Sequence, residues 1–365
     1  MLKDDIRLVL SAIPSDAAAE LLDGFGSAGG IFDATKEEIL AVKELSSRTL
    51  NKLLSPADDK RIEKELEFIE RYSIRPISYI SSEYSQNLAA VFDPPSTLFV
   101  KGAIDFNNAP SKWIGIVGTR KCSPYGVSSV ERLVAEIAER HPDAVIVSGL
   151  AYGIDSYAHR AAVKCGLKSV GVFAHGLDTI YPNEHRDLAK KMIDQGGAVA
   201  TEYMSECNIT KYNFLKRNRI IAGLCSAIIM AESPEKGGSM VTASIADGYG
   251  RDIFSFPARI SDRSFTGNLQ LLRSNRANIL TSVKDIEYVM GWSETVREKK
   301  LDFTKHILSD AEQEIFELFR DGETLTADEI LESTTLPAMK IMSALTSLEF
   351  KGLIKSVKGK MYIKC

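Results

Sequence analysis

The chain has 365 residues, which is too long for one ordinary hydrophobic core and predicts two or three domains. Hydrophobic residues make up 44% and charged residues 26% of the chain, a globular composition that argues against a largely disordered protein. The formal net charge of −4 excludes a protein that coats polyanions with its whole surface, so any nucleic-acid site must be local.

Cysteine usage and hydropathy restrict the compartment. The 5 cysteines are widely spaced and form no C-x-x-C pair, which argues against a disulfide framework or a structural zinc site and favours a reducing environment. The N-terminus lacks a signal-peptide pattern, and no apolar run reaches the length of a membrane span. We therefore expect a cytoplasmic protein without membrane contact.

Residues 1–75 are predicted to be helical. Apolar residues recur at spacings of three and four in "IRLVLSAI", "AAAELLDGF", "KEEILAV" and "KRIEKELEFIERY". Thr35 and Glu38 have the spacing of a capping box, which predicts the start of one of these helices.

Residues 76–295 change to alternating strand and helix patterns. The predicted strands are "KWIGIVG", "AVIVSG", "KSVGVFA", "GAVATEY", "SAIIMAE" and "DIFSFPA". Amphipathic segments lie between most of them: "GVSSVERLVAEIAERH", "GIDSYAHRAAVKCG", "EHRDLAKKMIDQ" and "GSMVTASIADGYG". Apolar strands separated by helices predict an α/β domain with a doubly wound, mostly parallel, Rossmann-like sheet.

Residues 296–365 are predicted to form a charged linker and a separate small domain. Three helical segments, "SDAEQEIFELFRDG", "TADEILESTT" and "PAMKIMSALTSLEFKG", precede two strands in "LIKSVKGKMYIKC". Three helices followed by a hairpin is the layout of a winged helix.

Ligands of open parallel sheets gather at the carboxyl ends of the strands, and "GIVGTRKCSPYG" follows one of these strands. Gly118 permits a tight turn, and Ser123 and Pro124 fit the cap and first turn of a helix. Free N–H groups at that helix start favour an anion, and Arg120 adds a positive charge. The alternative is a plain strand-to-helix turn, and the G-x-G-x-x-G fingerprint of dinucleotide binding is missing.

Two further loops follow strands. In "VSGLAYGIDSYAH", Asp155 and His159 lie on one helical face; a polar helix start is favoured over a metal or acid-base pair because no third ligand has a suitable spacing. In "EKGGSMVTASIADGYG", Gly237, Gly238 and Ser239 precede a helix and form another anion-friendly start. No catalytic constellation, metal site or cofactor motif stands out, so we expect none.

The segment "KYNFLKRNRIIAG" is a basic and aromatic island, interpreted as a loop before the next strand. Lys211, Arg217 and Arg219 predict a positive floor for phosphates, and Phe214 predicts a stacking platform for bases. Asn218 fits a hydrogen bond to a base edge or within the loop. The alternatives are a solvated basic turn with Phe214 in the core, and Arg219 as an anchor of the loop to the sheet.

Taken in order, these motifs resemble the DNA-processing protein A (DprA/Smf) family. The similar stretches are "DPPSTLFVKG", "GIVGTRKCSPYG", "VSGLAYGIDSYAH", "GLDTIYPNEHRDLA", "TEY", "FLKRNRIIAG", "GGSMVTASIADGYGR" and "GNLQLL". They run from about residue 93 to residue 281, and the flanking regions look like domains that some members carry. The N-terminal region looks like a SAM-like or helix-hairpin-helix module, with Glu44 near the place of the hairpin glycine.

The resemblance implies a single-stranded-DNA-binding protein that protects incoming DNA and loads the RecA recombinase during natural transformation. It implies a non-enzymatic homodimer joined through the Rossmann-like domain. The residues it expects at phosphates and bases are Arg120, Lys211, Phe214 and Arg217. Those expected to shape the cradle are Gly118, Thr119, Ser148, Gly149, Gly237, Gly238 and Ser239.

A second hypothesis is a nucleotide-processing enzyme similar to the lysine-decarboxylase-like phosphoribohydrolases. Their P-G-G-x-G-T-x-x-E loop is similar in outline to "KGGSMVTASIA". After Thr242, however, the next carboxylate is Asp247, so the motif's acid is absent. A scaffold or duplex-binding role led by the winged helix is a third hypothesis.

Overall fold

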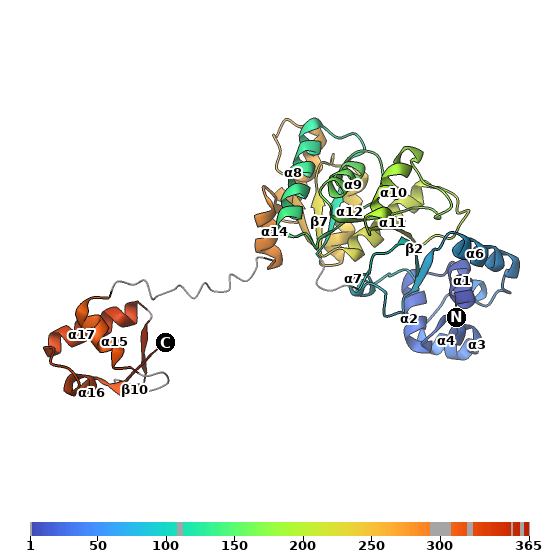
Figure 1. Ribbon diagram of the computed structural model, residues 1–365. Coiled ribbons are helices and arrows are strands. Elements are labelled where there is room, and N and C mark those ends of the chain that lie inside the picture. The colour runs from blue at the N-terminus through green and yellow to red at the C-terminus, as the bar shows by residue number, and fades with distance from the viewer. Residues whose placement is uncertain are drawn as a thin grey trace. The chain divides into compact units, whose positions relative to one another are not determined.

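The computed structural model describes residues 2–107, 112–292, 308–319, 324–351, 353–357 and 361–364. The chain divides into two compact units, Met1–Trp292 and Ser293–Cys365 (Figure 1). Most of the predicted linker falls within residues 293–307, outside the described residues. Among the described helices, none has the length and apolar character needed to cross a bilayer.

The first unit is built on a nine-stranded sheet with the order β1-β2-β6-β5-β4-β3-β7-β8-β9. Its parallel strands are β3 (Trp113–Val117), β4 (Val145–Ser148), β5 (Lys168–Val172), β6 (Ala198–Thr201), β7 (Ala227–Met230), β8 (Asp252–Ser255) and β9 (Asn278–Ile279). Two antiparallel strands extend one edge, β1 (Arg75–Ser78) and β2 (Thr97–Gly102). The predicted doubly wound, mostly parallel sheet is confirmed, and so are all six predicted strands.

Strand order reverses at β3. The chain winds outward through β4, β5 and β6, then returns to pair β7 with the other side of β3. The connections after β3 and β7 therefore leave in opposite directions, which opens a crevice at the carboxyl ends of these two strands.

Helices cover both faces of the sheet (Figure 1). One face packs against α8 (Pro124–Arg140), α9 (Ile154–Lys164), α10 (Arg186–Asp194) and α14 (Val283–Met290). The other face packs against α7 (Gln86–Ala89), α11 (Lys211–Leu224) and α12 (Gly238–Gly248). Three further elements complete this part: η1 (Asn183–His185), η2 (Arg263–Phe265) and α13 (Thr266–Arg273).

The segment Lys211–Leu224 is helix α11, so the expectation of a loop here is wrong. Thr210 caps it by accepting a hydrogen bond from the Asn213 N–H at 3.2 Å. Arg217, Asn218 and Arg219 are buried together with the apolar residues that follow, so the helix lacks an apolar stripe opposite a polar one. Helix prediction from periodicity depends on that contrast.

Six helices form the predicted N-terminal helical region. They are α1 (Leu2–Ser11), α2 (Ser15–Phe25), α3 (Ala28–Asp33), α4 (Lys36–Val42), α5 (Ser47–Leu53) and α6 (Asp59–Arg71). The predicted capping box is confirmed, since Thr35 accepts from the Glu38 N–H while Glu38 accepts from the Thr35 N–H. Because this region belongs to the same compact unit as the sheet, the domain boundary at residue 75 stays a prediction.

The second unit has the predicted winged-helix architecture. Its helices are α15 (Asp310–Glu317), α16 (Ala327–Glu332) and α17 (Ala338–Phe350). Its sheet has the order β10 (Thr324–Thr326), β12 (Met361–Lys364) and β11 (Ile354–Val357), of which β10 was not predicted. Ile315, Ile330, Ile341, Leu345 and Leu348 form its core.

Candidate nucleic-acid interface

A crevice of about 450 Å³ opens at the carboxyl ends of β3 and β7. The turn after β3, helix α11 and the start of α12 supply most of its walls. Nine of the predicted site residues line it: Gly118, Thr119, Arg120, Phe214, Arg217, Asn218, Gly237, Gly238 and Ser239. Strand-order reversal thus brings together residues that are more than one hundred positions apart in the sequence.

The helix start after β3 already holds an anion, the carboxylate of Glu232. Glu232 follows β7, is fully buried and accepts hydrogen bonds from the Ser123 N–H at 2.8 Å and the Ser123 hydroxyl at 2.9 Å. Ser123 caps α8 as predicted, accepting from the Gly126 N–H at 3.1 Å. The expectation that this helix start would recruit an external anion is corrected: the chain fills it from within.

An exposed cation and an aromatic ring meet at the mouth of the crevice. The guanidinium carbon of Arg120 lies 5.2 Å from the centroid of the half-buried Phe214 ring. Tyr181 contacts the same ring edge-on, with 5.9 Å between centroids. A cation beside aromatic faces is the combination that binds a phosphate and stacks a neighbouring base.

Arg217 lies at the base of the crevice and is only 4% exposed. Its Nη1 donates to the Gly149 carbonyl at 2.8 Å and to the Val172 carbonyl. The Gly149 N–H in turn donates to Asp155 at 3.2 Å. Burial lowers the pKa of Arg217 to about 10, which leaves it charged at neutral pH, and raises the pKa of the Asp155 carboxyl. Arg217 and Asp155 therefore hold the backbone of Gly149 from both sides and fix the loop that follows β4.

That loop has an unusual backbone. Leu150 has a φ of 50°, and Gly153 has a φ of 76°. A Cβ added at Gly149 would lie 2.3 Å from both terminal nitrogens of Arg217. Glycine is required at position 149 because the guanidinium packs directly against the backbone.

The start of α12 forms the opposite wall. Its N-cap residue is Gly237, and the Ser239 hydroxyl donates to the Ser233 hydroxyl at 2.8 Å. A Cβ at Gly238 would meet no heavy atom within 4 Å among the described residues. The backbone of this helix start is thus accessible from the crevice, and its dipole favours an anion.

Four predicted site residues do not line the crevice. Ser148 is fully buried and donates to the Ile116 carbonyl at 2.6 Å, while Gly149 lies behind Arg217. Lys211 is exposed at the start of α11. Arg219 is 4% exposed and pairs with Glu202 at 2.5 Å. This contact fits the alternative considered from the sequence, in which Arg219 anchors its segment to the sheet.

Eight lining residues were not predicted as site residues: Val117, Lys121, Ala151, Asp155, Leu215, Ile221, Pro234 and Thr242. Lys121 adds a second exposed cation beside Arg120. Its position next to Arg120 in the same motif could have identified it from the sequence. Asp155 and His159 do not bond each other: His159 Nδ1 contacts the Ser169 hydroxyl at 2.5 Å. No group of three metal-ligating side chains occurs in the part of the chain that the structure describes.

Comparison with known proteins assigns both units to one family. Residues 75–291 match the model of the DNA recombination-mediator protein A family, and residues 300–360 match the DprA winged helix domain. The DNA processing protein DprA of Streptococcus pneumoniae is 36% identical over 63% of this chain and 77% of its own. The protein Smf of Escherichia coli is 32% identical over 82% of this chain and 80% of its own.

Two solved structures share the fold. The X-ray structure of Streptococcus pneumoniae DprA superposes with a TM-score of 0.68 at 30% identity, covering 78% of this chain and 96% of that one. A Helicobacter pylori DNA processing protein A, described for its single-stranded DNA binding mode, gives a TM-score of 0.53 at 27% identity, covering 60% of this chain and 97% of that one. The chain belongs to the DNA recombination-mediator protein A family, the DprA/Smf proteins.

Proposed function

We propose that this chain binds single-stranded DNA through the crevice at β3 and β7, protects incoming strands and delivers them to the RecA recombinase during natural transformation. The observation that carries the proposal is the Arg120–Phe214 contact at the crevice mouth, 5.2 Å from guanidinium carbon to ring centroid. A relative from Helicobacter pylori is described as binding single-stranded DNA, which supports the same polymer as ligand.

The side chains take different roles in this proposal. Arg120, Lys121 and Lys211 are exposed cations for phosphates, and Phe214 stacks a base. The accessible start of α12 at Gly237, Gly238 and Ser239 holds a second phosphate, and Gly118 and Thr119 shape the wall between them. Arg217 acts on DNA through the loop that it fixes at Gly149, together with Ser148 and Asn218, and Arg219 anchors α11.

Binding is favoured over nucleotide hydrolysis by Glu232. Its carboxylate fills the helix start where a Rossmann-like enzyme would place a nucleotide phosphate. Incubation with nucleoside monophosphates tests this directly: we expect no release of free base, and release would favour the phosphoribohydrolase hypothesis.

The DNA site is tested with fluorescence anisotropy of labelled dT20 at several salt concentrations. Arg120→Ala removes one charge-assisted contact, so we expect affinity to fall roughly tenfold or more. The slope of log K against log salt should fall by about 0.7, the value for one phosphate on a single strand. Arg132→Ala, on the exposed surface of α8, is the matched control. Unchanged affinity and slope in Arg120→Ala would refute the site.

Assembly and RecA delivery are further parts of the proposal and rest on family membership. We expect a homodimer joined through the sheet domain, which light scattering of the full chain tests. We also expect the chain to accelerate RecA filament formation on dT-rich strands that are coated with single-strand-binding protein. A monomer at micromolar concentration, or no acceleration, would contradict the respective part.

A further inference from the structure

The helices before β1 supply no wall of the DNA crevice, whose lining among the described residues begins at Val117. These helices belong to the same compact unit as the sheet, so an effect on DNA binding would have to pass through a connecting segment. The loop between β6 and α11, residues 202–210, is such a segment. It leads into the first turn of α11, which carries Lys211 and the crevice residue Phe214.

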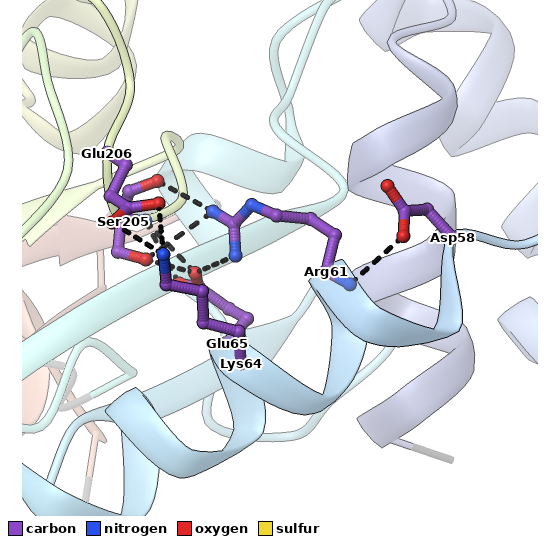
Figure 2. Close-up of polar contacts among 6 residues, drawn as sticks. All are labelled: Asp58, Arg61, Lys64, Glu65, Ser205 and Glu206. Atoms are coloured by element: carbon purple, nitrogen blue, oxygen red, sulfur yellow. Dashed lines mark hydrogen bonds and ion pairs between the residues drawn. The ribbon is translucent and has the colours of Figure 1, made fainter.

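Helix α6 holds one end of this loop (Figure 2). Glu65 is 2% exposed and accepts hydrogen bonds from the Ser205 N–H at 3.0 Å and from the Ser205 hydroxyl at 2.5 Å. Arg61 pairs with Glu65 at 2.8 Å and donates to the Ser205 carbonyl at 2.6 Å. The buried carboxylate is thus compensated by a cation, and both backbone polar groups of Ser205 are bonded to one helix. These contacts fix Ser205 relative to α6.

Helix α11 holds the other end of the loop. Asn213 donates from its side chain to the Asn208 carbonyl at 2.9 Å, and Thr210 caps the helix by accepting from the Asn213 N–H. The Thr210 hydroxyl also donates to Asn213 Oδ1 at 2.7 Å. The bonds that begin at α6 thus continue, across Glu206 and its neighbour, to the residue directly before Phe214.

Glu206 joins these two ends in a strained conformation. Its φ is 59°, in the left-handed region where a residue with a bulky side chain persists only when its surroundings hold it. The pair of Glu206 with Lys64, at 2.7 Å, joins side chains that are more than half exposed and contributes little by itself. The buried contacts of Ser205, its chain neighbour, therefore hold the strained backbone.

We propose that α6 positions the DNA site: through Ser205 and the left-handed Glu206 it sets the direction in which the chain enters α11, and so the place of Phe214. Glu65 and Arg61 are positioning residues, which act through the loop and make no contact with DNA. The start of α11 is then in place before the strand arrives, and binding costs little in ordering it. The inference rests on the proposed function, because it concerns how Phe214 is presented to DNA.

Two substitutions at Glu206 separate the backbone conformation from the side chain. Glu206→Asn and Glu206→Val both remove the pair with Lys64, but asparagine tolerates a positive φ and the β-branched valine does not. The valine variant should favour a loop path that displaces the start of α11, so that fewer molecules hold Phe214 in the binding arrangement. In anisotropy with the full chain, we expect Glu206→Val to bind dT20 about fivefold more weakly than Glu206→Asn, the factor for one left-handed residue at the low end of its range.

Ser73→Val is the matched control. Ser73 is also exposed and left-handed, with a φ of 51°, but it follows the last turn of α6 and leads into β1 instead of α11. This variant should lower the urea midpoint and leave the affinity for dT20 unchanged. The two Glu206 variants should share one salt slope, because both keep every cation that meets DNA; a slope lower by about 0.7 in the valine variant would indicate a lost phosphate contact and overturn the positioning role. Equal affinity of the two Glu206 variants would overturn the inference and leave the DNA crevice standing, whereas a wild-type chain that does not bind dT20 would overturn both.

Hydrogen exchange tests the same coupling without a substitution. Because coupling between two sites is reciprocal, a strand that fixes Phe214 must also stabilise the contacts that position it. We expect saturating dT20 to slow amide exchange in peptides from α6 and from residues 202–210 of the full chain. Peptides from α14, which packs on the opposite face of the sheet from α11, should slow less and serve as the control. Unchanged exchange in α6 and in the loop would overturn the inference.

Discussion

Gly149→Ala should destabilise the sheet unit by displacing Arg217. The added Cβ would lie 2.3 Å from both terminal nitrogens and 2.5 Å from the central carbon of the guanidinium. Arg217 would then lose its bonds to the Gly149 and Val172 carbonyls, and Asp155 would lose its nearest positive charge. Breaking a buried pair on one side costs about 3–5 kcal/mol, so we expect a loss near 3 kcal/mol.

A double-mutant cycle isolates this cause. Arg217→Ala should itself cost about 3–5 kcal/mol, because it leaves the Asp155 carboxylate buried without its cation. The double variant should cost no more than Arg217→Ala alone, since the clash needs the guanidinium; the coupling energy is then close to −3 kcal/mol. Additive losses would refute the reasoning.

Urea unfolding followed by tryptophan fluorescence measures these energies. Both tryptophans of the chain, Trp113 and Trp292, lie in the unit Met1–Trp292, so the signal reports on this unit alone. Anisotropy with dT20 separates positioning from contact. Arg217→Ala should weaken binding without the drop of about 0.7 in salt slope that loss of a phosphate contact gives.

Two further changes test other contacts. Burial lowers the pKa of His159 from 6.5 to about 3, so the unfolded chain binds the extra proton between these values; stability is full above pH 6.5 and falls by up to about 1.4 kcal/mol per unit below it. His159→Gln should flatten this acid limb in urea titrations, and an unchanged limb would contradict the assignment. Gly126→Ala places a Cβ 2.1 Å from Glu232 Oε2 and should lower the urea midpoint, whereas Gly248→Ala, with open space around it, should raise the free energy of unfolding by up to about 1 kcal/mol. A stabilised Gly126→Ala would show that Glu232 is not fixed at this helix start.

The strands of the parallel sheet were predictable because each is an apolar run of five or so residues bounded by glycine or polar residues. β1 and β2 are antiparallel edge strands, β1 contains Pro76, and β9 has two residues, so their patterns are weak. β10 has three residues and pairs with the distant β12, which local sequence does not reveal.

Most of the crevice could be predicted because Gly118, Arg120 and Gly237 sit in strand-to-helix connections, and because Phe214 stands in a segment of unusually basic composition. The side chains that sequence misjudged are those whose partners are distant. Arg217 donates to the backbone 68 positions away, and Glu232 accepts from Ser123 across 109 positions. Whether a basic residue faces solvent or a buried carbonyl depends on such contacts, and composition is the same in both cases.

The buried Glu232 carboxylate has a consequence for selectivity between free nucleotides and a DNA strand. A free nucleotide carries phosphates that a vacant Rossmann helix start would capture. Here that position is already filled by the Glu232 carboxylate, which accepts two hydrogen bonds from Ser123. Mononucleotides consequently gain nothing at this point of the molecule, whereas a polymer can spread its contacts over the exposed cations and rings around it. On the proposed function, the start of α8 therefore gives free nucleotides no advantage over a DNA strand.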